Sequence, residues 1–520
     1  MAKNPEYKKL YQSEKQKLKD EMRLVKTGRR TEKKRIRQDC KQELKSLRTA
    51  KKELKQGYKH QQNLLEQYAG DAHACKRTGS LDPYELNDYL AYKPKSARPD
   101  MEIGWRRVDT AALLYPIVSS RGYTNVYRLC VTLREEVQRD LLQQAVDFVL
   151  PRFLPFKMRL CRGMFWYYFE QNYKRPPRVE KEKEYPCSYI EPLRNNDYLF
   201  RVTYFQRRIN LEVFHVLTDG YGALDFLKEL VYHYLRLAHP ELAAHCPHAL
   251  SSDLSLNMDD GFADNYEKKK LHPYHGDRAF LLKGELLPEG KLGVITGYMP
   301  LHEVKQAAKR YGLTVNEFIV SAVNWAVYQE YRNKMKFDRA IVTCVPVNMR
   351  PYYHSITTSN FFVNTAAKFM PAHTRHTFED VAAQIAQSLR SQITKEHLAD
   401  ILSIHVSAQN HIVSRSIPLF LKRPALRNIH KFSALFTSLT VSNMGRAEFR
   451  SDYMPYIDTM NVVLARSKRQ NLKTALISVE DRLTVTISSV LRRTQIQEYF
   501  YRFLVSEGIH VRIESNGVYN

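Results

Sequence analysis

The period of the hydrophobic positions changes along the chain, and from about residue 105 it predicts a mixture of strands and helices. Residues 127–133 are rich in strand formers, and residues 134–150 carry apolar side chains at helical spacing up to a proline. Two short apolar runs around an Arg-Gly pair at 162–163 predict a hairpin. Residues 198–217 read as one long strand, which leads through a turn into a helix over 223–238.

The second half has the same mixed character. Thr314 and Glu317 have the spacing of a capping box, which predicts a helix through residue 331, and Gly312 is the expected C-cap of the helix before it. Other strands are expected over 291–301, 339–349, 438–444 and 483–491, and other helices over 302–312, 378–393, 397–412 and 495–508. Strands and helices in each half, without strict alternation, predict an α+β protein with two similar mixed α/β subdomains.

Four regions follow from these patterns. Residues 1–70 are polar and helix-prone, and residues 71–104 have the Gly, Pro and Ser punctuation of a linker. The two subdomains are expected over 105–280 and 281–520. With 43% hydrophobic residues in 520, there is enough apolar material for substantial cores, which excludes a wholly disordered protein.

The net charge of +26 is concentrated at the start of the chain. Residues 1–60 hold 21 Lys and Arg against 8 Asp and Glu, a net +13, so half of the excess lies in about a ninth of the chain. The simplest interpretation is a solvated charged helix. The alternatives are contact with an anionic membrane surface or with an acidic protein. Nucleic acid is not expected as a partner, because no nucleic-acid-reading module accompanies the charges.

Other features point to a cytoplasmic protein that lies at most at the periphery of a membrane. No apolar run approaches the 18 residues of a spanning helix, and the first residues lack the apolar segment of a secretory signal. The seven cysteines are odd in number and include no Cys-x-x-Cys pair, which disfavours both a disulfide framework and a zinc ribbon.

The chemistry-bearing motif is His215-x-x-x-Asp219-Gly220, at the end of the predicted strand over 198–217. A neutral imidazole suits removal of a proton from an attacking hydroxyl or amine near neutral pH. The Asp-Gly turn allows a tight reversal that holds the histidine at the strand end. The bare pattern is moderate evidence, since a lone histidine beside a strand is more often a structural residue.

Four segments together resemble the chloramphenicol acetyltransferase-like (CoA-dependent acyltransferase) superfamily, closest to its bacterial alcohol acetyltransferase-like and condensation-domain-like members. FHVLTDGYGALDFLKEL resembles the active-site strand, loop and helix, and GLTVNEFIVSAVNWAVY resembles the helix that opens the second half. VPVNMRPYYHSITTSNFF and SLTVSNMG resemble two later strands. The resemblance covers residues 105–515 and implies two similar subdomains with an active-site channel between them.

The same resemblance implies roles for single residues. His215 is the general base in a ternary complex, and Asp219 supports the loop by pairing with an arginine, for which Arg350 is the leading candidate and Arg121 a weaker one. Asn360 and Ser442 are candidates to donate to the oxyanion. Strand-end packing or backbone capping is the alternative interpretation of Arg350, Asn360 and Ser442.

The implied reaction is acyl transfer from acyl-CoA, as co-substrate, to a hydroxyl or amine of a small-molecule acceptor, with no bound cofactor. Phe214 stands where condensation domains usually carry a second histidine, which makes peptide-bond condensation a weaker prediction. Two rivals remain: a non-catalytic scaffold or binding protein of the same fold, and a condensation-type domain that uses an acyl carrier protein.

Two histidine-containing clusters are candidate metal sites. They comprise His239, His245, Cys246 and His248, and His272, His275 and Asp277. Neither has a standard zinc spacing, so surface-loop histidines are expected and no metal. The chain has no Gly-x-Ser-x-Gly elbow, which disfavours a serine hydrolase.

Overall fold

The computed structural model of the chain describes residues 15–16, 19–20, 105–245, 257–267, 278–333, 339–372, 375–410 and 417–519. The chain forms two compact units, Met1–Pro99 and Asp100–Asn520. In the first unit the four described residues are helical. The predicted basic extension and linker otherwise lie outside the described residues.

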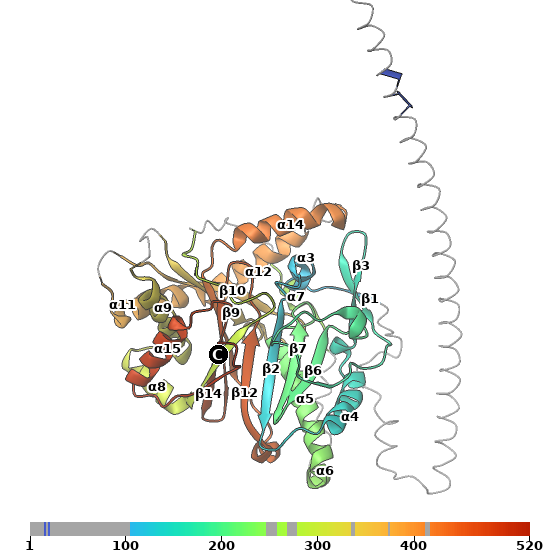
Figure 1. Cartoon of the computed structure of the whole chain (residues 1–520), viewed down its shortest axis with the longest axis horizontal. Coiled ribbons are helices and arrows are strands. Elements are labelled where there is room, and N and C mark those ends of the chain that lie inside the picture. Colours follow the sequence, from blue (N-terminus) through green and yellow to red (C-terminus); the bar gives the residue numbers. More distant parts are fainter. Residues whose placement is uncertain are drawn as a thin grey trace, which may run out of the picture. The chain divides into compact units, whose positions relative to one another are not determined.

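The second unit contains the strands and helices of the fold (Figure 1). Its strands are β1 (Trp105–Arg107), β2 (Val126–Leu133), β3 (Met158–Arg162), β4 (Tyr167–Gln171), β5 (Glu180–Lys181), β6 (Phe200–Phe205), β7 (Arg208–Phe214), β8 (Gly293–Pro300), β9 (Ile341–Asn348), β10 (Phe362–Phe369), β11 (Leu439–Arg446), β12 (Ile457–Leu464), β13 (Leu472–Val479), β14 (Arg482–Ser489) and β15 (Arg512–Ser515). Its α-helices are α3 (Tyr115–Val118), α4 (Arg139–Val149), α5 (Gly220–Ala238), α6 (Pro240–His245), α7 (Gly261–Asp264), α8 (Leu301–Arg310), α9 (Val315–Tyr331), α10 (Arg350–Tyr353), α11 (Phe378–Gln392), α12 (Lys395–Asn410), α14 (Leu419–Ser433) and α15 (Gln495–Ser506).

The first half is a five-stranded sheet in the order β12-β2-β7-β6-β5, with α4 and α5 packed on one face. Strand β7 shows why the sheet has two different faces. Ile209, Leu211 and Val213 are fully buried in the core shared with α5, whereas Asn210 and Glu212 are buried on the opposite face. This alternation follows from the two-residue period of a strand.

The single long strand predicted over 198–217 is wrong: the structure has a hairpin of β6 and β7, in which Phe205 pairs with Arg208. The two-residue turn contains Gln206, which adopts a left-handed φ of 50°. The buried apolar positions reveal the reason, because they are even-numbered at Phe200 and Val202 but odd-numbered along β7. Such a change of phase cannot occur within one regular strand.

The helix predicted over 134–150 starts later, at Arg139. The residues before it bond elsewhere: the backbone N–H of Arg134 donates to Tyr456 and that of Val137 to Gln206. The predicted hairpin around residues 162–163 is confirmed by the antiparallel register of β3 and β4.

The second half is a seven-stranded sheet in the order β10-β9-β11-β13-β14-β8-β15. Helices α8, α9, α11 and α15 lie together at its side in Figure 1 and share one hydrophobic core with it. The predicted capping box is present at the start of α9, with Thr314 and Glu317 bonded reciprocally. Gly312, after α8, has a left-handed φ of 66° that suits a helix C-terminus.

The two halves share a strand. Strand β12 comes from the second half of the sequence, yet it pairs antiparallel with β2 at the edge of the first sheet. It also packs beside β13 and β14 of the second sheet. The predicted boundary at residues 280/281 therefore does not separate the two sheets, because residues 457–464 complete the first one.

Buried charges tie the polar face of the first sheet together. Glu212 is fully buried and accepts hydrogen bonds from the side chains of Arg128 (2.8 Å) and Arg201 and from the backbone N–H of Cys187 (2.6 Å). Burial by itself raises the pKa of Glu212, but the charges of Arg128 and Arg201 outweigh burial and lower the pKa below its usual value. Glu212 is therefore an ionised carboxylate that compensates two cations.

Replacing Glu212→Gln removes that charge with little change of shape. We expect the free energy of unfolding, measured by chemical denaturation, to fall by about 3 kcal/mol, because Arg128 and Arg201 lose the fully buried carboxylate they share and keep only Glu182 and Glu184 as partners. Glu498→Gln is the control: it breaks an exposed pair with Arg502 on α15 and should change stability by less than about 1 kcal/mol. Equal effects of the two variants would contradict a stabilising role for the buried cluster.

Candidate active site

His215 lies directly after β7, between the two halves of the fold. Its backbone N–H donates to the carbonyl of Asn125 (2.9 Å), which fixes the chain where the strand ends. Its imidazole stacks on Tyr115 of α3 with ring centroids 4.7 Å apart and meets the ring of Tyr127 edge-on at 4.9 Å. Phe362 of β10 lies 5.6 Å away on the side of the second half. The ring is therefore held by aromatic neighbours while remaining partly exposed.

The side chain of Asn360 fixes the orientation of the imidazole. Its Oδ1 lies 3.0 Å from His215 Nδ1, and its Nδ2 donates to Asp109 Oδ2 at 3.1 Å. Because an ionised carboxylate only accepts, Asp109 selects the amide orientation in which Oδ1 faces the histidine. The histidine proton then resides on Nδ1 and the lone pair on Nε2, which has no hydrogen-bond partner among the described residues.

The electrostatics favour a neutral imidazole. Burial lowers the pKa of His215 below its usual 6.5, although the charge of Asp219 and the hydrogen bond to Asn360 act in the opposite direction. Burial and the nearby Asp260 raise the pKa of Asp109 to about 7. Above about pH 7, where Asp109 is ionised, His215 is unprotonated and can accept a proton at Nε2.

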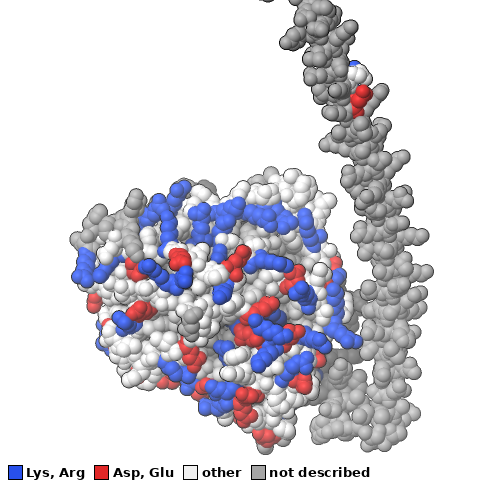
Figure 2. All heavy atoms as spheres, viewed as in Figure 1, with Lys and Arg blue, Asp and Glu red and all other residues white. Residues whose placement is uncertain are grey.

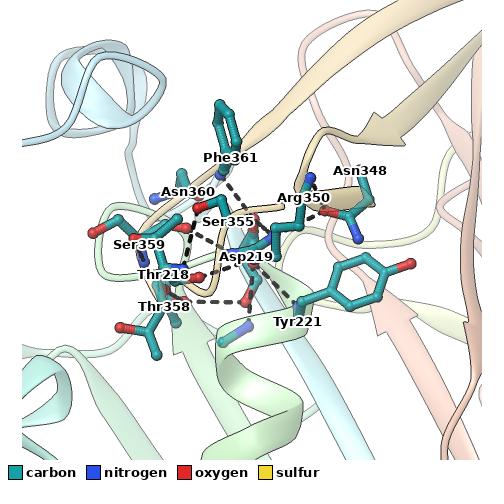
Figure 3. Close-up of polar contacts among 12 residues, drawn as sticks. Thr218, Asp219, Tyr221, Asn348, Arg350, Ser355, Thr358, Ser359, Asn360 and Phe361 are labelled. Carbon is teal, nitrogen blue, oxygen red and sulfur yellow. Dashed lines mark hydrogen bonds and ion pairs between the residues drawn. The ribbon is translucent and has the colours of Figure 1, made fainter. Parts of the chain in front are cut away.

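Asp219 is the hub of the polar contacts in Figure 3. Arg350 donates two hydrogen bonds to it, Nη1 to Oδ2 at 2.8 Å and Nη2 to Oδ1 at 3.0 Å. Asp219 also caps α5, accepting from the backbone N–H groups of Tyr221 and Gly222, and it accepts from the N–H of Phe361 at 2.9 Å. The carboxylate thus joins α5 of the first half to the segment before β10 of the second.

Arg350, the first residue of α10, is oriented by further contacts. Its Nε and Nη2 donate to the carbonyls of Thr357 (2.9 Å) and Ser359 (2.8 Å), and its Nη1 donates to Asn348 (3.1 Å). Of the two arginines named in the sequence analysis, this one pairs with Asp219. The other, Arg121, is 83% exposed at its side chain and pairs with Glu191.

At the start of α5, Gly220 and Gly222 lie so close to neighbouring atoms that a side chain would collide with them. A Cβ on Gly220 would lie 2.5 Å from the sulfur of Met444, the flexible end of a side chain that can move. A Cβ on Gly222 would lie 2.4 Å from the backbone oxygen of Thr358, which cannot. Gly222 is therefore the stricter requirement, although the motif drew attention to Gly220.

Asn360 and Ser442, the two predicted hydrogen-bond donors to the oxyanion, differ from each other in their surroundings. Asn360 is fully buried with its Oδ1 on His215 and its Nδ2 on Asp109, an arrangement that orients the histidine. Ser442 lies on β11, where it alternates with Val441 in the core of the second half. It shares its strand face with Met444, the side chain against Gly220. Its hydroxyl has no hydrogen-bond partner among the described residues.

Four neighbours of the site had no sequence signal. Tyr115, Tyr127 and Asp109 lie far from the motif along the chain, and only the packing of β2 and α3 brings them to His215. Lys473 of β13 is the fourth, and its charge contributes to the low pKa of His215. Burial lowers the pKa of Lys473 to about 8.

The polar face of the first sheet also opens into a cleft of about 910 Å³. Arg128, Arg201 and Glu212 belong to its lining, and Glu212 lies on β7, three residues before His215. Nine Lys and Arg line the cleft against six Glu, and the basic residues include Arg178, Lys181, Arg194, Lys291 and Arg466. The cleft therefore offers cations next to the strand that ends at the histidine.

No group of three or more His, Cys, Asp and Glu side chains within the described ranges is placed to hold a metal ion. His239, the one member of the two histidine clusters whose side chain is described, lies between Glu135 and Glu241. The side chain of His245 and residues 246, 248, 272, 275 and 277 lie outside the described part.

Solved structures of acyltransferases and of a condensation domain have the same fold. F. graminearum TRI101, complexed with coenzyme A and deoxynivalenol, matches with a TM-score of 0.55 at 9% identity, over 79% of this chain and 99% of that one. The TRI3 trichothecene 15-O-acetyltransferase of Fusarium sporotrichioides matches with a TM-score of 0.51 at 11% identity, over 77% and 94%.

The first condensation domain of the calcium-dependent antibiotic synthetase matches with a TM-score of 0.51 at 14% identity, over 78% of this chain and 96% of that domain. No protein-family model and no curated protein sequence matches the chain. The likeness is therefore one of structure, and it confirms the predicted fold, an α+β architecture like that of the CoA-dependent acyltransferases.

Arg350→Lys tests the hub at Asp219. A lysine keeps the charge but cannot donate two parallel hydrogen bonds to Asp219. It also cannot donate at the same time to the carbonyls of Thr357 and Ser359 and to the side chain of Asn348. We expect the free energy of unfolding to fall by about 2–3 kcal/mol. Arg121→Lys, at the exposed alternative, should leave it within about 0.5 kcal/mol. Chemical denaturation measures the free energy of unfolding of both variants. If Arg350→Lys left it unchanged, the ion pair would not hold the two halves together.

Proposed function

We propose that the protein transfers an acyl group from acyl-CoA to the hydroxyl or amine of a small-molecule acceptor, with His215 as the general base. The observation that carries the proposal is the chain of contacts Asp109–Asn360–His215, which presents an unprotonated Nε2 in a partly exposed position. The likeness of the fold to acyltransferases supports the same reaction class.

In the proposed reaction the acceptor oxygen or nitrogen attacks the thioester carbonyl while Nε2 takes the acceptor's proton. The tetrahedral intermediate collapses by breaking the carbon–sulfur bond, and the proton passes from the imidazolium to the departing CoA thiolate. The products are the ester or amide and free CoA. No acyl-enzyme forms, so donor and acceptor are bound together.

The neighbours of His215 have supporting roles in this proposal. Tyr115 and Tyr127 hold the ring by stacking and edge contact, and Asn360 is a positioning residue that fixes its tautomer. Ser442 remains our candidate donor to the oxyanion, because its hydroxyl is uncommitted among the described residues. The cations of the 910 Å³ cleft suit the phosphates of CoA.

His215→Ala provides the decisive test. Free-thiol release is measured from a panel of acyl-CoAs, with small alcohols and amines as acceptors. We expect acceptor-dependent release by the wild type and a loss of about a hundredfold or more in the variant, the usual contribution of a general base. His302→Ala is the control, since this histidine is exposed and paired with Asp481.

Equal rates for wild type and His215→Ala would exclude His215 as the base. If the wild type neither released thiol nor bound any acyl-CoA, the scaffold would become the better interpretation. Transfer from an acylated carrier protein but not from acyl-CoA would favour the condensation-type alternative.

The dependence of kcat/KM on pH tests the positioning role of Asn360. Below about pH 7 Asp109 becomes protonated. The protonated carboxyl of Asp109 then donates its O–H to Oδ1 of Asn360, whose amide has turned over. Nδ2 of Asn360 now faces Nδ1 of His215 and donates to it. The histidine proton therefore moves to Nε2, where it prevents His215 from acting as a base. We therefore expect the rate to fall as the pH drops through about 7, although the pKa of His215 itself lies lower.

Asp109→Asn removes the titrating group, so the acid limb should move to lower pH while the plateau rate decreases. Asp140→Asn, which changes an exposed carboxylate on α4, should keep the wild-type profile. An unchanged limb in Asp109→Asn would assign the titration to another group.

A further inference from the structure

Helix α14 exposes several large apolar side chains and buries one of its lysines. Four of its large apolar side chains face solvent: Phe420, Leu421, Ile429 and Phe432 are 62%, 55%, 63% and 56% exposed. Lys422, by contrast, is only 7% exposed. Its ammonium lies 3.4 Å from the ring centroid of Trp166 and donates to the carbonyl of Phe165 at 3.2 Å. A helix normally buries its apolar stripe and exposes its lysines.

The exposed apolar surface continues beyond the helix. The N–H of Leu419 donates to the carbonyl of Met164 at 2.8 Å, which joins the start of α14 to the turn between β3 and β4. Met164 itself is 70% exposed. We call the exposed side chains of Met164, Phe420, Leu421, Ile429 and Phe432 the α14 surface. Large apolar side chains that a helix and the adjoining hairpin turn both expose mark an interaction site.

The charged residues of α14 itself, Lys422, Arg423, Arg427 and Lys431, are all basic. Arg427 and Lys431 on the same helix are exposed, and Arg423 is partly exposed. Residues 401–447 contain six Lys and Arg and no Asp or Glu. In Figure 2 basic side chains form a band along the edge where α14 lies in Figure 1, with uncharged surface above it.

From this arrangement we infer that the α14 surface docks on an anionic lipid membrane. Exposed Phe, Leu and Ile side chains flanked by Lys and Arg are the pattern of a helix that lies in the membrane interface. The apolar residues insert between the lipids, and the cations meet the negative headgroups. The apolar side chains stand on a protruding helix and a hairpin turn, which suits a deformable lipid surface. No helix among the described residues is long and apolar enough to cross a bilayer.

The α14 surface is connected to the candidate active site. Arg427 Nε donates to the carbonyl of Ile117 in α3 at 2.8 Å. Two residues earlier in the same short helix, Tyr115 stacks on His215. Docking therefore brings the neighbourhood of His215 to the membrane, and, resting on the proposed function, we expect an acyl chain or acceptor drawn from the lipid phase.

Flotation of the full-length protein with vesicles tests the docking without requiring catalysis. Vesicles of phosphatidylcholine alone are compared with vesicles of phosphatidylcholine and phosphatidylserine. We expect the wild type to float with the anionic vesicles only, and less as salt is added. The double variant Phe420→Ser, Phe432→Ser should lose about tenfold or more of the binding, and Lys431→Glu about fivefold.

Val505→Ser is the matched control, because this valine is 55% exposed on α15 and should float like the wild type. Thermal unfolding checks that the variants remain folded. Flotation of the double variant at the wild-type level would overturn the proposal and assign any membrane binding to the basic N-terminal residues. A wild type that floats with neither vesicle would also overturn it and would favour an acidic protein as the partner. Thiol release is measured separately, so failure of the docking is distinct from failure of the proposed function.

Discussion

The ion pair between Arg350 and Asp219 is the constraint on which the arrangement of the site depends. Its two hydrogen bonds connect the N-terminus of α5 in the first half to the segment between β9 and β10 in the second. Arg350 also donates to the carbonyl of Ser359, and Asn360 is the next residue in the chain. The same arginine therefore sets the position of the amide that contacts His215. The buried pair is satisfied by several donors and acceptors, the condition under which a buried charge pair is tolerated.

Water exclusion and hydrogen bonding act in opposite directions on the titratable groups near His215. Burial favours the neutral forms of the imidazole, of Asp109 and of Lys473, and the hydrogen bond from Asn360 partly counteracts this at Asp109. The outcome is a set of groups that titrate near or below neutrality rather than at their ordinary values. Such clustering of perturbed groups is common at functional sites.

Local signals predicted much of the fold and part of the site. The capping box at Thr314 and the strand end at His215 depend on short stretches of sequence, whereas the arginine of the Asp219 pair was implied by the family resemblance. The turn at Gln206 was missed because it interrupts a run of strand formers with neither Gly nor Pro. The orienting role of Asn360 and the presence of Asp109 depend on contacts across 251 residues of chain, and no periodicity encodes such contacts.

Strand β12 has a consequence for how the protein is made. Because residues 457–464 form the edge of the first sheet beside β2, that sheet is incomplete until more than 300 further residues have been added after β2 (Figure 1). Domains of a growing chain usually fold in order as they emerge from the ribosome. Here the edge of β2 stays open during synthesis, and its hydrogen-bonding groups must avoid other chains until the second half arrives. Production in the cell should therefore be more sensitive to chaperone capacity than the stability of the finished fold would suggest.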